Sequence, residues 1–139
     1  MAELLPDLEW PVASEFWQAA QRGELCFPRC DGCGRFQWYP LPRCPQCHRS
    51  SFSWTAVEPR GRVVTFTVLH RAFLPHLTDC LPHTVVVVDV PAAPGVRLIS
   101  SPVGPDEAAS IATGSRVEIV FQANESGFRF PRVRPTDRG

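Results

Sequence analysis

The sequence predicts a mostly β protein in which a short N-terminal helix precedes a small cysteine-rich ribbon and a five-stranded barrel. Three observations lead to this prediction. Two CxxC pairs lie close together in the first half of the chain. After residue 57 come short stretches rich in β-branched and aromatic residues, separated by Gly and Pro. The fifteen prolines disfavour an all-helical bundle, because proline lacks the backbone N–H that a helix interior needs.

The composition indicates a soluble globular protein, which we expect in the cytoplasm. The 139 residues suit one domain or two small ones, and a composition 44% hydrophobic and 20% charged argues against disorder. The first ten residues carry three carboxylates and no basic group, unlike a secretory signal, and no stretch reaches the ~18 apolar residues of a membrane span. The formal net charge of zero disfavours a protein that tracks a nucleic-acid backbone.

The N-terminal helix is predicted at residues 14–22. Ser14 is a suitable N-cap, and Gly23 follows the last helical residue. Phe16 and Trp17 fall on one face of this short helix. Such large aromatic side chains need a surface to cover them, and that surface is either the chain's own ribbon or barrel or another protein. The sequence leaves these two alternatives open.

The two CxxC pairs carry the most specific local signal. Cys30 and Cys33 form the first pair, Cys44 and Cys47 form the second, and ten residues separate them. Two such pairs supply four thiolates to one tetrahedral ion, which is the pattern of structural zinc. A closed set leaves no open position for a substrate, so we predict a structural zinc ion; iron has the same ligand geometry and remains possible. Disulfides are disfavoured by the expected reducing compartment.

The remaining cysteines, His48 and the aromatic residues around the pairs have simpler interpretations. Cys26 and Cys80 lie outside the spacing and are predicted to be ordinary buried thiols. His48 follows a ligand and is either an additional candidate or an exposed side chain. Aromatic residues around the pairs are expected to supply the core of the ribbon, which is too small to have much core of its own: Phe36, Trp38, Phe52 and Trp54.

The second half of the chain predicts antiparallel strands. There is no room for the long crossovers that parallel strands need. Five strands with a break between the third and fourth, wide enough for one helical turn, suit an OB-like barrel. We predict the strands at residues 62–70, 84–90, 96–101, 116–121 and 127–133. The chain then divides into a helical segment at 1–25, a ribbon at 26–56, the barrel at 57–133 and a polar tail at 134–139.

No catalytic constellation is visible. His70, His76 and His83 lie in or beside a long loop at residues 71–83, but no nucleophile accompanies them in a recognisable motif. The loop is rich in apolar residues, and an ordered apolar loop of this length is more often an interaction surface than a disordered one. We therefore expect no enzymatic activity from the chain by itself.

The order of these features resembles a known family. The resemblance rests on the Phe16-Trp17 helix, Gly23-Glu24-Leu25, the two CxxC pairs with Pro42-Arg43 before the second, Gly61 opening a strand, Pro82-His83-Thr84 entering a valine-rich strand, and the final segment 114–121. Over residues 10–133 this is similar to the family called "domain of unknown function 35". The resemblance implies a rubredoxin-like zinc ribbon joined to an OB-fold that is associated with acyl-CoA.

The resemblance also implies a role as a partner. Family members of this kind are accessory subunits of thiolase-like acyl-CoA enzymes, including steroid side-chain aldolases, hydroxymethylglutaryl-CoA synthases and polyketide-type acyltransferases. Others pair with MaoC-like enoyl-CoA hydratases. The partner carries the catalytic residues, and the OB-fold subunit completes or stabilises the acyl-CoA site. We accordingly expect a non-catalytic subunit of a thiolase-like or MaoC-like enzyme in fatty acyl-CoA or steroid metabolism, with acyl-CoA in a shared site.

Two surfaces are predicted from this role. Apolar residues in excess of what a small divided core can bury, together with a neighbouring arginine, are expected to meet the partner: Phe16, Trp17, Arg71, Phe73, Leu74 and Leu77. Three arginines of the barrel are expected to contact the phosphates of coenzyme A: Arg97, Arg116 and Arg129.

A different class of function is the alternative. An OB-fold beside a zinc ribbon can bind single-stranded nucleic acid. Residues 57–134 contain eight arginines and seven acidic residues. This near-neutral balance disfavours binding along the phosphate backbone of a nucleic acid. We therefore expect neither nucleic acid nor a membrane as a partner.

Overall fold

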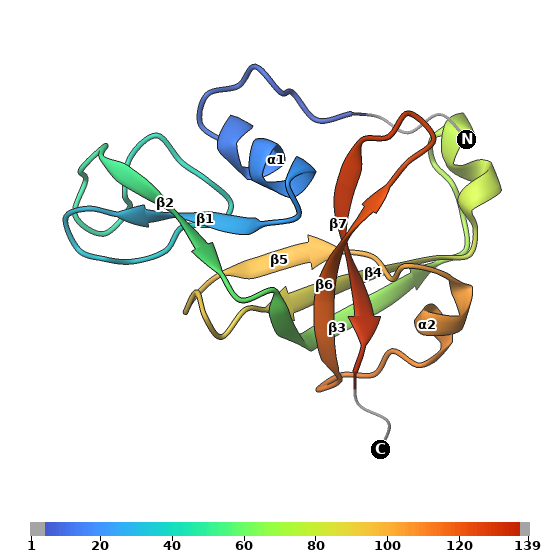
Figure 1. The fold of residues 1–139 in the computed structure, drawn as a ribbon. Coiled ribbons are helices and arrows are strands. Elements are labelled where there is room, and N and C mark those ends of the chain that lie inside the picture. Colours follow the sequence, from blue (N-terminus) through green and yellow to red (C-terminus); the bar gives the residue numbers. More distant parts are fainter. Residues whose placement is uncertain (1–4, 137–139) are drawn as a thin grey trace.

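The computed structural model describes residues 5–136, apart from the side chains of His76 and Leu77. It contains a two-stranded ribbon at one end and a curled five-stranded sheet at the other, with helix α1 (Ser14–Gln21) packed against both (Figure 1). No helix among these residues is long and apolar enough to cross a membrane. The predicted order of helix, ribbon and barrel is confirmed.

Helix α1 ends as the sequence predicts and begins differently. Gly23 has a left-handed backbone (φ +77°), and its N–H donates to the Ala20 carbonyl oxygen at 3.0 Å. At the start, Ala13 occupies the N-cap position, and no side chain there makes a capping hydrogen bond. Ser14 is therefore the first helical residue, and its predicted capping role is wrong.

The ribbon pairs β1 (Leu25–Cys30) with β2 (Phe52–Val57) in antiparallel register. Cys30 lies opposite Phe52, so the metal-binding loops start where the pairing ends. The stretch around residue 36 forms only a single bridge to Arg29. Residues 25–28 are all buried, because both faces of β1 are covered by neighbouring elements.

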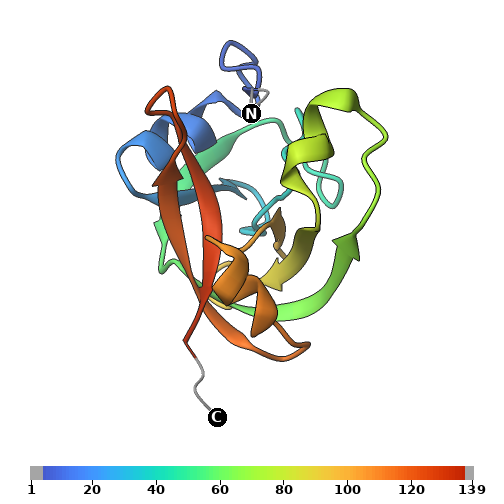
Figure 2. The ribbon, with the colours of Figure 1, turned by 90° about the vertical axis from the view of Figure 1, so that its right-hand side faces the viewer.

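The five-stranded sheet curls into a half-barrel. Its order is β5-β4-β3-β6-β7, and a parallel bridge between Pro102 and Val133 joins its two outer edges. The Val133 N–H also donates to the Ser101 carbonyl oxygen at 3.0 Å. The strand order and the curl of the sheet suit a partly open five-stranded Greek-key barrel, and together with the family match they confirm the OB-fold prediction (Figure 2). The strands are β3 (Arg60–Leu69), β4 (His83–Asp89), β5 (Arg97–Ser100), β6 (Arg116–Ala123) and β7 (Arg129–Pro135).

The segments between the strands include two short helices. The predicted helical turn is α2 (Pro105–Ala109), between β5 and β6. The long apolar loop contains a 3-10 helix, η1 (Pro75–Cys80). Strand β7 runs to Pro135, so the barrel includes the start of the segment that the sequence assigned to the tail.

A single core joins the three parts of the molecule. Alternate residues of β4 point inward, including Val86 and Val88. These side chains belong to the same buried cluster as Phe16 of the helix and Phe27 of the ribbon. The ribbon therefore shares one buried core with the helix and the barrel, as expected for a ribbon with so few buried residues of its own.

Candidate metal centre and surface sites

The four predicted cysteine ligands converge on one point. Their Sγ atoms all lie within 4.8 Å of one another, with Cys30 and Cys47 3.4 Å apart and Cys33 and Cys44 3.6 Å apart. Four sulfurs bound tetrahedrally to one ion at ~2.3 Å stand roughly 3.8 Å apart, so the set fits such an ion. Among the residues whose side chains are described, no other group of three or more His, Cys, Asp or Glu side chains converges in this way.

The two halves of the site have the same backbone geometry. In the first half, the Cys30 N–H donates to the carbonyl oxygen five residues ahead at 2.8 Å, and the Cys30 carbonyl oxygen accepts from the N–H four residues ahead at 2.9 Å. The second half, starting at Cys44, repeats both hydrogen bonds at the same lengths. The fourth residue after each of these cysteines has positive φ: +76° at Gly34 and +65° at His48.

At the first cysteine of each pair, the loop backbone favours the ionised thiol. The backbone N–H of Cys33 lowers the pKa of the Cys30 thiol to about 6, and burial opposes this only in part. The backbone N–H of Cys47 lowers the pKa of the Cys44 thiol in the same way. Thiolates are the form that binds a metal ion, so the first cysteine of each pair is prepared for ligation near neutral pH.

Neighbouring residues hold the loops in place, and the sequence analysis did not single them out. The Gln37 side-chain amide donates to the Cys44 sulfur at 3.5 Å. The Asp31 carboxylate accepts hydrogen bonds from the Ser51 and Ser53 hydroxyls, which ties the first loop to the start of β2 and lowers the pKa of Asp31. At Gly32 an added Cβ would lie 2.5 Å from Cδ of the Arg49 side chain and 3.2 Å from the Cys47 sulfur, so a larger residue there would have to displace Arg49 and would crowd a metal ligand.

His48 occupies the position that glycine occupies in the other loop, and it lies outside the group of convergent ligands. We expect His48→Gly to retain the metal and to raise the free energy of unfolding by up to ~1 kcal/mol, because non-glycine residues are strained in the left-handed region. Gly34→Ala is the matched control and should lower it by a similar amount. Urea unfolding and metal analysis test this, and loss of metal from His48→Gly would show that the imidazole is a ligand.

The aromatic residues of α1 are covered by the chain itself. Phe16 is only 2% exposed, and its ring centroid lies 4.3 Å from that of Trp38. Trp17 is half-buried and packs on Phe128 and Phe130 near β7, with centroid distances of 5.9 and 5.8 Å. Phe16 thus packs on the chain's own ribbon, as in the first of the two alternatives for this helix, while Trp17 packs on the barrel and keeps part of its surface exposed. Phe16 has almost no surface to offer a partner.

The loop after β3 presents the apolar surface instead. Phe73 is 86% exposed, and Leu74 and Arg71 are exposed beside it. The predicted interface residue Leu77 has its side chain outside the described part of the structure. Apolar side chains at the end of β3 are also exposed, which the sequence analysis missed because they alternate as ordinary strand residues. Phe66 and Val68 share one face of the strand. We call these two residues and the exposed apolar residues of the following loop the β3-loop surface: Phe66, Val68, Phe73 and Leu74.

Among the described residues, the end of β3 near this surface has no partner strand on its β6 side. Strand β3 pairs with β6 only through residues 60–62, whereas its pairing with β4 continues to Leu69. Figure 1 shows η1 at the opposite end of the molecule from the ribbon. The β3-loop surface is therefore separate from the metal centre.

The three predicted arginines do not form one group. Arg97 and Arg116 lie in the same row across the sheet, through the register partners Asp89 and Arg62. Arg129 lies at the start of β7, where its backbone N–H donates to the side-chain oxygen of Gln21 in α1. The structure thus brings two of the three arginines onto one face of the barrel.

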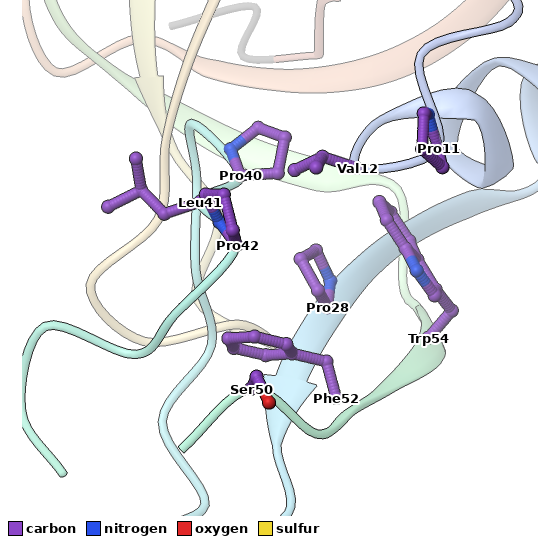
Figure 3. Close-up of a pocket in the computed structure, with 9 residues that line it drawn as sticks. All are labelled: Pro11, Val12, Pro28, Pro40, Leu41, Pro42, Ser50, Phe52 and Trp54. Carbon is purple, nitrogen blue, oxygen red and sulfur yellow. The ribbon is translucent and has the colours of Figure 1, made fainter. Parts of the chain in front are cut away.

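A hollow of about 330 Å³ lies beside the ribbon. Figure 3 shows proline and aromatic side chains from the N-terminal segment, from β1 and β2 and from the loop between them facing this space. Ser50 contributes the one hydroxyl among the lining side chains, and no acid or base lines the hollow. The hollow therefore suits contact with an apolar group and not acid–base catalysis. Its lining residues are Pro11, Val12, Pro28, Pro40, Leu41, Pro42, Ser50, Phe52 and Trp54.

Comparison with known protein families matches both parts of the chain. Residues 17–53 match the rubredoxin-like zinc ribbon domain of ChsH2, and residues 54–122 match the C-terminal OB-fold domain of ChsH2. The chain belongs to the ChsH2 family of zinc-ribbon and OB-fold proteins. The two matched regions meet at β2, where the ribbon passes into the barrel. A comparison with curated proteins returned no match.

Two solved structures of similar proteins have the same fold. A chain of the structure described as "Ltp2-ChsH2(DUF35) aldolase" is 22% identical, with a TM-score of 0.80 over 96% of this chain and 100% of that one. A protein of unknown function from the DUF35 family of Sulfolobus solfataricus is 15% identical, with a TM-score of 0.64 over 93% of this chain and 88% of that one. At these identities the likeness concerns the fold, and it confirms the resemblance to the domain of unknown function 35.

Proposed function

We propose that the chain is a non-catalytic subunit that binds a thiolase-like enzyme of aldolase type and completes its acyl-CoA site. The observation that carries this proposal is the β3-loop surface, an exposed apolar region on a barrel whose relative forms part of an aldolase assembly. Exposed apolar surface of this kind marks protein–protein contact in soluble proteins.

The metal centre supports a structural role within that subunit. We propose that the bound ion is zinc, because four thiolates in two CxxC loops are the ligand set of closed zinc sites and the matched ribbon family is a zinc ribbon. With all four positions taken by protein sulfurs, the ion has no open position for substrate. Catalysis would then come from groups of the partner.

The composition of the β3-loop surface suits an interface. Phe73 is a large aromatic side chain and almost fully exposed, and Leu74 extends the apolar area next to it. Arg71 lies two residues from Phe73 and is exposed, and Arg is enriched at interfaces together with aromatic anchors. Within residues 5–136, β3 beyond Val63 pairs with no strand on its β6 side, so its backbone groups there can hydrogen-bond with a partner.

Assembly with a thiolase-like protein tests the proposal, and a thiolase-like protein whose gene adjoins the gene of this chain is the one to use where it exists. Phe73→Ala and Leu74→Ala are each expected to weaken binding by ~1–3 kcal/mol, because a buried interface anchor loses its contacts. Zinc content and stability of the free chain should not change. Calorimetric titration of one protein with the other measures the binding. Acyl-CoA cleavage should be negligible for the chain alone and should rise when it joins its partner.

Tyr39→Ala is the matched control, since Tyr39 is 62% exposed but lies near the ribbon. It should bind the partner normally. If Tyr39→Ala weakens assembly and Phe73→Ala does not, the contact lies at the ribbon end of the molecule. Enzyme-like turnover by the isolated chain, or tight salt-sensitive binding to single-stranded oligonucleotides without partner binding, would contradict the proposed function.

A further inference from the structure

The second half of β3 is an uncovered edge strand. Residues 65–69 are all exposed, so side chains on both faces of the strand meet solvent there. Over the same stretch β4 alternates between buried and half-buried residues, as a strand with one covered face does. β6 and the turn before it accompany β3 only as far as Val63, and among the described residues no other strand takes their place.

The hydrogen bonds of Val63 fix the direction of the backbone groups at this edge. Its N–H donates to the Ser115 carbonyl oxygen at 2.9 Å, and its carbonyl oxygen accepts from the Gly114 N–H at 2.8 Å. Both backbone groups of Val63 therefore point to the β6 side. Successive residues of an antiparallel strand point their backbone groups to opposite sides, so those of Arg62 point to β4, where Asp89 is its register partner.

The same alternation along β4 identifies the free backbone groups of β3. Every second residue of β4, counted from Asp89, faces β3, and the next two of these residues are paired with Thr65 and Thr67. Phe66 and Val68 alternate with these threonines, so their N–H and carbonyl groups point to the side that β6 has left. Within residues 5–136, no backbone group of a loop or turn bonds to either of them.

The edge is apolar along its length and positive at its ends. Residues 63–69 carry no charged side chain. Exposed arginines bracket them, Arg62 before and Arg71 after, and none of the described carboxylates forms an ion pair with either. Free strand edges in proteins are protected by charges, by proline or by a covering element. Residues 64–69 contain neither a charge nor a proline, so a covering element suits this edge.

The arginines also distinguish a second copy of the chain from a different protein as the covering element. Residues 64–68 read Val-Thr-Phe-Thr-Val, the same in both directions, so two copies paired antiparallel about Phe66 would match residue types. That pairing would bring Arg62 of one copy toward Arg71 of the other at both ends, where like charges repel. A segment with acidic residues at its ends would meet attraction instead.

We propose that an extended segment of a partner protein adds to β3 as a further strand, hydrogen-bonded to the outward backbone groups of Phe66 and Val68. Its central residues are apolar or β-branched, because they lie against an uncharged strand, and a carboxylate follows them beside Arg71. That this segment belongs to a thiolase-like enzyme rests on the proposed function. The capacity of the edge to accept a strand does not depend on that assignment.

Amide hydrogen exchange of the zinc-loaded full chain, measured by NMR, tests the proposal. The probe is the blocked peptide Glu-Val-Thr-Val-Thr-Val-Glu at saturating, millimolar concentration. We expect exchange at Phe66 and Val68 to slow at least about tenfold, because an added strand protects their N–H groups. Exchange at Thr65 and Thr67 should be slow with and without peptide, since these amides face β4. The same peptide with lysine at both ends should bind more weakly.

Val68→Pro and Val68→Thr form a matched pair of variants. Proline removes the outward N–H at this position and keeps the pairing of β3 with β4, because an edge strand tolerates proline where its N–H faces solvent. Val68→Pro should weaken peptide binding about tenfold through the lost hydrogen bond, whereas Val68→Thr should preserve it. Arg71→Glu should reverse the preference and favour the lysine-ended peptide. Zinc content and circular dichroism verify the fold of each variant.

Three results would overturn strand addition at this edge. One is unchanged exchange at Phe66 and Val68 with saturating peptide and in the complex with a thiolase-like enzyme alike. Another is equal peptide affinity of Val68→Pro and Val68→Thr. The third is protection of the two amides that rises with the concentration of the chain alone, which would identify a second copy as the covering element.

Exchange measured in the enzyme complex separates this inference from the proposed function. An enzyme that binds the chain without slowing exchange at Phe66 and Val68 would refute strand addition and leave the proposed function standing. Protection by the peptide without binding of any thiolase-like enzyme would support strand addition and contradict the proposed function.

Discussion

Cys44→Ser is expected to release the metal ion and unfold the ribbon. The Cys44 side chain is fully buried, its sulfur lies 3.6 Å from that of Cys33, and it accepts a hydrogen bond from Gln37. Structural zinc contributes ~10–16 kcal/mol of apparent binding free energy in zinc-finger peptides, which is as large as the whole stability of many domains. Metal analysis of the purified variant, together with near-ultraviolet circular dichroism, measures the loss.

Cys80→Ser is the matched control for this substitution. Cys80 lies at the end of η1, outside the group of four convergent sulfurs, so its removal should leave the metal content unchanged. The barrel of the Cys44 variant should also be destabilised, because ribbon and barrel share one buried cluster. A full metal complement in Cys44→Ser would show that the four-thiolate assignment is wrong.

The second large effect is expected at Phe16. Phe16→Ala should lower the free energy of unfolding by ~3–5 kcal/mol, the range for loss of a buried aromatic side chain and the cavity it leaves. The Phe16 ring lies against Trp38 and Phe27 of the ribbon, with centroid distances of 4.3 and 5.9 Å, so the cavity would open at the junction of helix and ribbon. Urea unfolding with saturating zinc measures the change.

Phe73→Ala makes the same chemical change at a side chain that is 86% exposed. It should alter the free energy of unfolding by less than ~0.5 kcal/mol, as surface substitutions usually do. Together, Phe16→Ala and Phe73→Ala distinguish an aromatic side chain of the internal core from one on the outer surface. If Phe16→Ala were fully stable and Phe73→Ala were unfolded, the packing described for α1 would be wrong.

Local sequence patterns predict the metal ligands and the barrel strands of this protein. The CxxC spacing predicts the four convergent sulfurs, because two residues between cysteines suffice to turn both sulfurs toward one ion, whatever the rest of the chain does. Alternation and β-branched content locate all five barrel strands to within a few residues. The equivalence of His48 and Gly34 escaped prediction, because a positive φ at a histidine has no sequence signal.

Only the tertiary structure decided which surfaces are free. Phe16 and Phe73 are the same residue type in apolar surroundings, yet one is covered by Trp38 and the other is exposed, because burial depends on segments far away in the chain. The same reason applies to the arginines. Arg62 and Arg116 are more than fifty residues apart, and the antiparallel register of β3 and β6 makes them opposite partners. The sequence alone thus determined the metal ligands and the strands, whereas long-range pairing and packing determined the outward-facing sites.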